Sequence, residues 1–180
     1  MINRYLNVAG KAAARAIAIL CLPLLACTLP SHADVLEDTT PSQLLRENFE
    51  DGNAKGWALK GRGNSKVTVY EGNHSLNLTR NRSAQISVST KGHDIIEITM
   101  QLAAMNLAEG ESCKAQISIN NGERWQTLLT VTPVMADAVT LHTKSGRIKN
   151  VPDTLLLRFI ANGGRQANCW GDNVSVIGKS

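Results

Sequence analysis

Residues 96–102 read Ile-Glu-Ile-Thr-Met-Gln-Leu, a strict alternation of apolar and polar side chains. Successive side chains of a β-strand point to opposite faces, so this run predicts a strand with one face buried and the other in water. An amphipathic helix would instead repeat its apolar residues three and four positions apart. The run therefore favours a sheet that is covered on one side.

The same period of two recurs along the rest of the chain. Further strand-like segments lie at residues 67–70, 75–78, 84–89, 113–119, 139–142, 155–160 and 174–176. Turn-forming residues separate them at 61–64, 71–73, 91–94, 120–122, 145–146 and 162–164. The Asn121-Gly122 pair between two such runs is the strongest hairpin signal. Roughly eight to ten short strands with regular turns predict an all-β fold, a two-sheet antiparallel sandwich or a barrel.

Residues 1–33 have the composition of a signal peptide. Basic residues precede an apolar run at 16–26, and Ser31-His32-Ala33 forms a small-residue cleavage site before Asp34. The apolar run is too short to span a bilayer, and no later segment is long enough, so no transmembrane segment is expected. The alternative is a lipoprotein signal, because Leu24-Leu25-Ala26-Cys27 resembles a lipobox with Cys27 as the lipid anchor.

The charge argues against one class of partner, and the cysteine content agrees with export. Three of the 19 Lys and Arg residues lie in the leader and all 15 Asp and Glu residues follow it, so the chain from Asp34 has a net charge of about +1. Such a weak positive charge argues against a nucleic-acid binder. Cys113 and Cys169 are the two cysteines left after cleavage, and in an oxidising compartment they are expected to form one disulfide. The alternative is two buried free thiols.

Three segments follow from these patterns: a signal peptide at 1–33, a flexible polar lead-in at 34–46 and a β-sandwich at 47–180. Within the sandwich, Asn48-Phe49-Glu50-Asp51-Gly52 with Gly56-Trp57 resembles the opening of bacterial jelly-roll modules of the carbohydrate-binding-module type. The ending Asp172-Asn173-Val174-Ser175-Val176 resembles the last strand of that class and of MAM-like domains. The resemblance implies a two-sheet antiparallel jelly roll of the concanavalin-like or galactose-binding-like type.

The resemblance also implies a structural calcium ion between the first and last strands of the sandwich. Glu50 and Asp172 occupy the matching positions, and calcium prefers oxygen ligands. The alternative is that both are ordinary polar residues at a turn and a strand end.

Sugars are bound by aromatic faces and by polar side chains that reach their hydroxyl groups. The candidate ligand-binding residues are Tyr70, Trp57 and Trp125. Tyr70 is expected to point outward, because it alternates with Val67 and Val69, whereas each Trp is better explained by packing in the sandwich.

A basic set forms a second candidate feature: Lys60, Arg62, Lys66, Arg80, Arg82 and Lys91. If neighbouring strands bring these residues together, they could meet an anionic polymer, such as an acidic polysaccharide, or lipid head groups. The alternative is that they are scattered solubilising charges.

The sequence does not predict an enzyme. His74, His93 and His142 lie on different segments, no catalytic motif occurs, and Glu109 and Glu111 flank a glycine in an expected loop. The expected protein is therefore an exported, non-catalytic binding module for a glycan or envelope polysaccharide, periplasmic or extracellular, or anchored as an outer-membrane lipoprotein. The alternative is an envelope module that binds another protein and has no sugar site.

Overall fold

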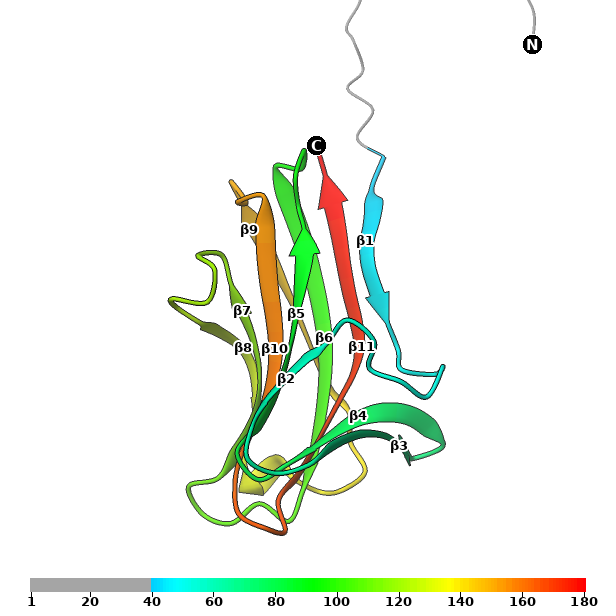
Figure 1. Cartoon of the computed structure of the whole chain (residues 1–180), viewed down its shortest axis with the longest axis vertical. Helices are drawn as coiled ribbons and strands as arrows, with labels where there is room; N and C mark the ends of the chain where they lie inside the picture. Colours follow the sequence, from blue (N-terminus) through cyan, green and yellow to red (C-terminus); the bar gives the residue numbers. More distant parts are fainter. Residues whose placement is uncertain (1–39) are drawn as a thin grey trace, which may run out of the picture. The chain divides into compact units, whose positions relative to one another are not determined.

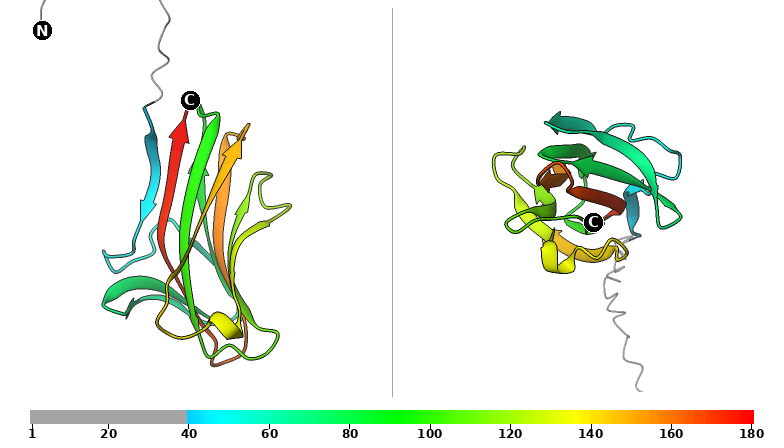
Figure 2. Two further views of the ribbon diagram at one scale, coloured as in Figure 1. Left: turned by 180° about the vertical axis from the view of Figure 1, so that it is seen from behind. Right: turned by 90° about the horizontal axis from the view of Figure 1, so that it is seen from below.

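The computed structural model describes residues 40–180, so the expected signal peptide and Cys27 lie outside the described residues. These residues form eleven strands in two antiparallel sheets. Figures 1 and 2 show how the strands are arranged. Sheet A contains β1 (Ser42–Glu47), β3 (Ser65–Tyr70), β4 (Asn73–Thr79), β6 (Ile95–Met105), β9 (His142–Lys149) and β11 (Asn168–Lys179). Sheet B contains β2 (Ala58–Gly61), β5 (Arg82–Ser89), β7 (Ser112–Ser118), β8 (Gln126–Val131) and β10 (Thr154–Asn162). The expected all-β jelly-roll sandwich is confirmed.

The strand order explains how distant segments become neighbours. Sheet A has the order β3-β4-β11-β6-β9, and sheet B has the order β2-β5-β10-β7-β8. β1 also pairs with β11, on residues 174–178, whereas β4 pairs with residues 168–171 of that strand. The pairing of β11 with β6 has a bulge between Asp172 and Ser175. This bulge lies between the part of β11 that pairs with β4 and the part that pairs with β1. No helix within residues 40–180 is long and apolar enough to cross a membrane.

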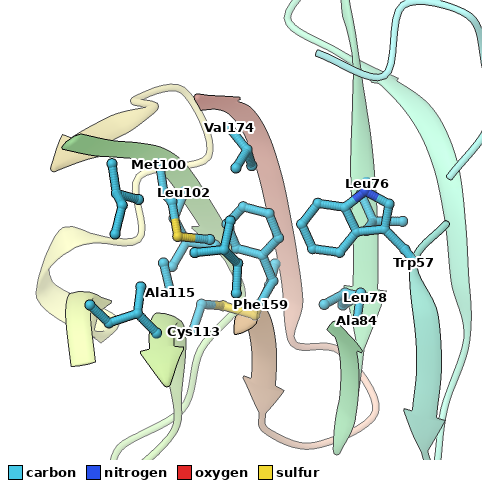
Figure 3. Packing of buried hydrophobic residues seen from close by; sticks show 14 of the residues in the cluster. Trp57, Leu76, Leu78, Ala84, Met100, Leu102, Cys113, Ala115, Phe159 and Val174 are labelled. Atoms are coloured by element: carbon cyan, nitrogen blue, oxygen red, sulfur yellow. A yellow bond between two sulfur atoms is a disulfide. The ribbon is translucent and has the colours of Figure 1, made fainter. Parts of the chain in front are cut away.

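The core lies between the two sheets, as the alternation predicted. Ile96, Ile98, Met100 and Leu102 of β6 are buried in one cluster with Leu157 and Phe159 of β10. Figure 3 shows Met100, Leu102 and Phe159 of this cluster. Each fully buried Leu, Ile, Met or Phe contributes about 1.5–3 kcal/mol relative to its exposed state. Burial of one face of each sheet is therefore the main stabilisation of the fold.

The predicted disulfide is confirmed between Cys113 of β7 and Cys169 of β11, with 5.7 Å between the Cα atoms. It joins sheet B to sheet A inside the core. The loop it closes spans 56 residues, so it links segments that local structure does not hold together.

Three expectations about elements were wrong. Residues 42–46 belong to β1 and not to a flexible lead-in, because Leu44 and Leu45 pack against the core while the strand pairs with β11. Residues 139–141 do not form a strand, and Ser145-Gly146 is not a turn but lies inside β9. Gly146 faces Leu128 of β8, and a Cβ atom there would lie 2.9 Å from Leu128 Cδ1.

Candidate functional site

Trp57, one of the three predicted aromatic ligands, lies in the core. Its side chain is 6% exposed, and its ring stacks on Phe159 at 5.6 Å between centroids and 17° between planes (Figure 3). Phe49 covers another side at 5.7 Å. Both neighbours are themselves fully buried. Trp57 therefore joins the first loop to sheet B by packing.

Tyr70 is also buried, so its expected exposure was wrong. It belongs to a second small cluster, on the outer side of sheet A, where its ring stacks on Trp170 at 4.5 Å. The alternation placed Tyr70 away from the main core, but Trp170 of β11 covers it. Burial, and then the charges of Asp137 and Glu71, raise the pKa of the Tyr70 phenol.

The two predicted calcium ligands have protein partners. Glu50 accepts hydrogen bonds from the backbone N–H of His74 (3.1 Å), and its other oxygen lies 3.2 Å from His74 Nδ1. Asp172 is buried and accepts hydrogen bonds from Ser75 Oγ (3.1 Å) and the Asn173 N–H (2.7 Å). Burial raises the pKa of Asp172, and the negative charges of Glu50 and Glu47 raise it further.

The negative charges of Glu50 and Asp172 suit a cation, but the two side chains supply few of the oxygen ligands that calcium needs. Calcium takes six to eight oxygen ligands, and residues 40–180 contain no group of three or more His, Cys, Asp or Glu side chains placed to share a metal ion. Backbone carbonyls or waters would have to complete the shell. Calcium therefore stays a prediction.

The strongest polar arrangement is on the outer side of sheet B, which we call the B face. One residue from each of the five strands lies directly beside its neighbour on the next strand, and together they form a row across the B face. The row consists of Ala58, Gln85, Arg158, Gln116 and Thr127. The Arg158 Nε–H donates to Gln116 Oε1 at 2.7 Å, and Gln116 Nε2 donates to Thr127 Oγ1 at 2.9 Å. This chain of hydrogen bonds fixes the orientation of the side chains before any ligand arrives.

Trp125, the third predicted aromatic residue, borders this row. The Arg158 guanidinium lies 3.8 Å from the centre of the Trp125 ring, a cation–π contact that holds the half-buried ring on the B face. Partial burial lowers the pKa of Arg158, although a guanidinium stays charged at physiological pH. Of the three predicted aromatic residues, Trp125 is the one that the structure brings beside outward polar side chains.

The β7–β8 loop positions Trp125. Asn121 and Gly122 have the positive φ angles (55° and 88°) that the Asn-Gly signal predicted. Ser118 Oγ accepts a hydrogen bond from the Gly122 N–H at 2.9 Å and donates one to Asn120 Oδ1 at 2.8 Å. A cavity of about 430 Å³ lies at the base of this loop, lined by residues 117–120 and 124–126. The Asn-Gly pair predicted this loop from the sequence. No sequence signal predicted that Arg158 contacts Gln116 and Trp125.

Several solved structures with the same fold are carbohydrate-binding modules. The CBM22-1 xylan-binding domain from Paenibacillus barcinonensis Xyn10C is 21% identical, with a TM-score of 0.54 over 77% of this chain and 96% of that domain. The C-terminal family 22 module of Clostridium thermocellum Xyn10B is 14% identical, with a TM-score of 0.54 over 76% and 94%. The TmCBM61 module, solved with β-1,4-galactotriose, is 14% identical, with a TM-score of 0.53 over 75% and 97%.

At these identities the likeness establishes the fold, and it confirms the predicted resemblance to jelly-roll modules of the carbohydrate-binding type. No protein-family model matches the sequence, and no curated protein matches it.

Proposed function

We propose that this protein is a non-catalytic glycan-binding module and that its ligand lies across the B face. The observation that carries the proposal is the row Gln85–Arg158–Gln116–Thr127 with Trp125 at its side. Amide, guanidinium and hydroxyl groups offer donors and acceptors to sugar hydroxyls, and an indole offers an apolar surface to the C–H face of a sugar ring. The carbohydrate-binding modules of the same fold support this reading.

The composition of sheet B supports a binding role and not hydrolysis. Glycoside hydrolysis uses a pair of carboxyl groups that flank the scissile bond. The five strands of sheet B contain neither Asp nor Glu. The strands of the B face therefore hold a sugar chain without supplying an acid and a base.

Export is part of the same proposal. The core disulfide is typical of proteins that fold in an oxidising compartment, and the composition of residues 1–33 suits a signal peptide. A periplasmic or extracellular location gives the module access to polysaccharides. Attachment through Cys27 would place it at the outer membrane instead.

The direct test is a binding screen of the exported protein against immobilised polysaccharides, with the wild type, Trp125→Ala and Gln116→Ala. We expect each variant to lose on the order of tenfold in affinity, or about 1.4 kcal/mol. Thr99→Ala is the matched control, because Thr99 is an outward polar residue of sheet A, bonded to Ser145 Oγ. Circular dichroism establishes that each variant is folded. A folded wild-type protein that retains no polysaccharide would refute the proposal and favour the envelope-protein partner.

The calcium ion at Glu50 and Asp172 remains part of the proposal as a structural element. Burial is the main cause of the raised pKa of Asp172, and the negative charges of Glu50 and Glu47 raise it further. A bound cation would offset this repulsion between the carboxylates. We expect calcium, compared with a chelator, to raise the melting temperature of the wild type and to leave Asp172→Asn unchanged. Equal melting temperatures of the wild type in both conditions would exclude the ion.

A further inference from the structure

The charge of sheet B has one sign. Its five strands carry Lys60, Arg82, Lys114 and Arg158 and no acidic residue. The strands of sheet A, in contrast, include Glu47, Glu97 and Asp172 among their charged residues. Lys60, Lys114 and Arg158 lie on the outer side, whereas Arg82 lies at the strand end on the inward side, where its Nε–H donates to Ser65 Oγ of β3 at 3.3 Å. Three outward cations and no acid make the B face cationic, although the chain from Asp34 is nearly neutral.

Three more arginines lie where the B face ends. Arg62 of the β2–β3 loop, Arg80 of the β4–β5 turn and Arg165 of the β10–β11 loop line one cavity of about 260 Å³, together with Asn81, Gly163 and Gly164. We call this cavity the arginine pocket. Asn81 also lines a second cavity of the same volume, whose wall includes Lys60, Arg82 and Asn162. The arginine pocket thus continues the cationic side of sheet B.

Of the basic set singled out in the sequence, the two cavities bring together Lys60, Arg62, Arg80 and Arg82. Lys91 lies apart from them, in the β5–β6 loop, where the neighbouring Gly92 carbonyl accepts a hydrogen bond from Ser180 Oγ. Arg165 is an addition that the strand-like segments did not suggest, because it reaches the pocket through the β10–β11 loop.

Close backbone contacts hold the arginine pocket together. A Cβ atom on Gly63 would lie 2.2 Å from the Thr79 carbonyl oxygen, so the β2–β3 loop lies directly on the end of β4. The Asn64 N–H also donates to Thr79 Oγ1 at 3.1 Å. Arg82 Nη1 donates to the Gly61 carbonyl at 2.8 Å, which joins β2 to the start of β5. The arginines therefore extend from a fixed backbone.

No acidic side chain neutralises the pocket through an ion pair. Residues 40–180 form two such contacts, His74–Glu50 and Lys179–Glu97, and neither involves Arg62, Arg80 or Arg165. Glu111 lies beside Gly163 and Gly164 of the pocket lining, and its carboxylate accepts hydrogen bonds from the backbone N–H groups of Ala108 (2.8 Å) and Gly164 (2.5 Å). Its hydrogen bond to Gly164 holds the β10–β11 loop, and it forms no ion pair with the three pocket arginines.

We propose that the glycan is an acidic polysaccharide, whose carboxylate or sulfate groups bind the arginine pocket while its sugar rings follow the B face. This inference rests on the proposed glycan-binding function and names its ligand class. A guanidinium can bind a planar carboxylate or a sulfate through two parallel hydrogen bonds. From Arg158 to Asn162, β10 spans about 13 Å, so one chain can reach both regions. The core disulfide favours an exported polymer over a nucleic acid.

The test compares polymers that share a backbone but differ in charge. Polygalacturonate is paired with its methyl-esterified form, and dextran sulfate with dextran, which distinguishes carboxylate from sulfate recognition. Binding to the full exported protein is measured by calorimetry at about 50 and 300 mM salt. We expect the charged member of at least one pair to bind more than tenfold tighter at low salt and to weaken as salt increases.

The variants locate the effect. Arg62→Gln/Arg165→Gln removes two charges from the pocket, and Lys91→Gln/Lys149→Gln removes two from other exposed positions, one in the β5–β6 loop and one at the end of β9. We expect the first variant to lose at least tenfold in affinity for the charged polymer and the second less than twofold. Equal losses of affinity in both variants would show that only the overall charge matters, and would refute the arginine pocket as the binding site.

The remaining outcomes distinguish failure of this inference from failure of the proposed function. Equal affinity for the charged and uncharged members of both pairs, or binding to neutral glycans alone, would overturn the acidic ligand and leave the glycan-binding proposal intact. Duplex DNA bound as tightly as the charged polysaccharide would overturn the assignment to a polysaccharide. Failure to bind any polysaccharide would refute both proposals.

Discussion

Arg158 joins three parts of the B face through one side chain. Its Nε–H bonds Gln116, its guanidinium lies on Trp125, and Gln85 lies beside it on the neighbouring strand. Removal of this side chain releases the indole and leaves Gln116, which is 8% exposed, with one hydrogen-bond partner fewer. Arg158 therefore contributes both to the stability of the loop at Trp125 and to the shape of the ligand surface.

We expect Arg158→Met to lower the free energy of unfolding by about 1–2 kcal/mol, from the lost cation–π contact and the lost charge-assisted hydrogen bond. Urea denaturation measures the change. Lys114→Met is the matched control, because Lys114 also lies on the B face and is in register with Ile160. A loss no larger than that of the control would show that the Arg158 contacts do not stabilise the fold.

Asp137 provides a pH-dependent contribution to stability in the β8–β9 loop. Its carboxylate accepts hydrogen bonds from Thr140 Oγ1 (2.6 Å) and from the N–H groups of Thr140 and Val139, and these lower its pKa from 3.8 to about 2. Because the pKa is lower in the folded state, the stabilisation is complete above about pH 4 and is lost as the pH falls through 2. An NMR titration of the Asp137 carboxyl should give a midpoint near 2. A midpoint near 3.8 would contradict these hydrogen bonds.

Trp125 and Tyr70 show how far sequence reasoning reaches for single residues. Alternation predicted that Tyr70 points away from the main core, but it could not show that Trp170, a hundred residues away, covers the ring. The sequence favoured Tyr70 over Trp125 as the exposed aromatic residue, because Arg158, the partner of Trp125, is distant in the sequence. Side-chain direction is local, whereas exposure depends on which strands become neighbours.

At the scale of elements, the sequence predicted β6 clearly and did not predict β9. β6 is central in sheet A, and its inward apolar residues gave a clear alternation. β9 is an edge strand of mostly exposed polar residues, with Gly146 facing Leu128, so its sequence resembles a turn. The B face was not predictable for a related reason, because it depends on the register that places Gln85 and Gln116 beside Arg158.

Gly171 determines how closely β11 approaches sheet B. A Cβ atom there would lie 2.5–2.7 Å from three carbon atoms of the Phe159 ring, which packs in the core. We expect Gly171→Ala to cost about 1–3 kcal/mol, because the ring must move within a densely packed interior. Gly146→Ala is the matched control in the same sheet, since its close contact is the flexible end of Leu128. Comparable unfolding free energies for both variants would contradict this account.

At the scale of the whole molecule, the disulfide is the covalent bond between the sheets. Cys113 lies on β7 of sheet B and Cys169 on β11 of sheet A, and both are buried. The cysteine count alone predicted this pair, since two cysteines follow the leader. The sequence did not reveal that the bond joins opposite layers, because that depends on the crossover of the chain between sheets.

Cross-linking two layers through a loop of 56 residues restricts the unfolded chain strongly. The chain-entropy relation gives about 4 kcal/mol for such a loop, so Cys113→Ala/Cys169→Ala should lower the free energy of unfolding by about that amount. Urea denaturation of the wild type with a reductant should approach the value of the double variant, and the reductant should not affect the variant itself. If the reduced wild type kept its full stability, the two sheets would be held by packing alone, and the disulfide would no longer support folding in an oxidising compartment.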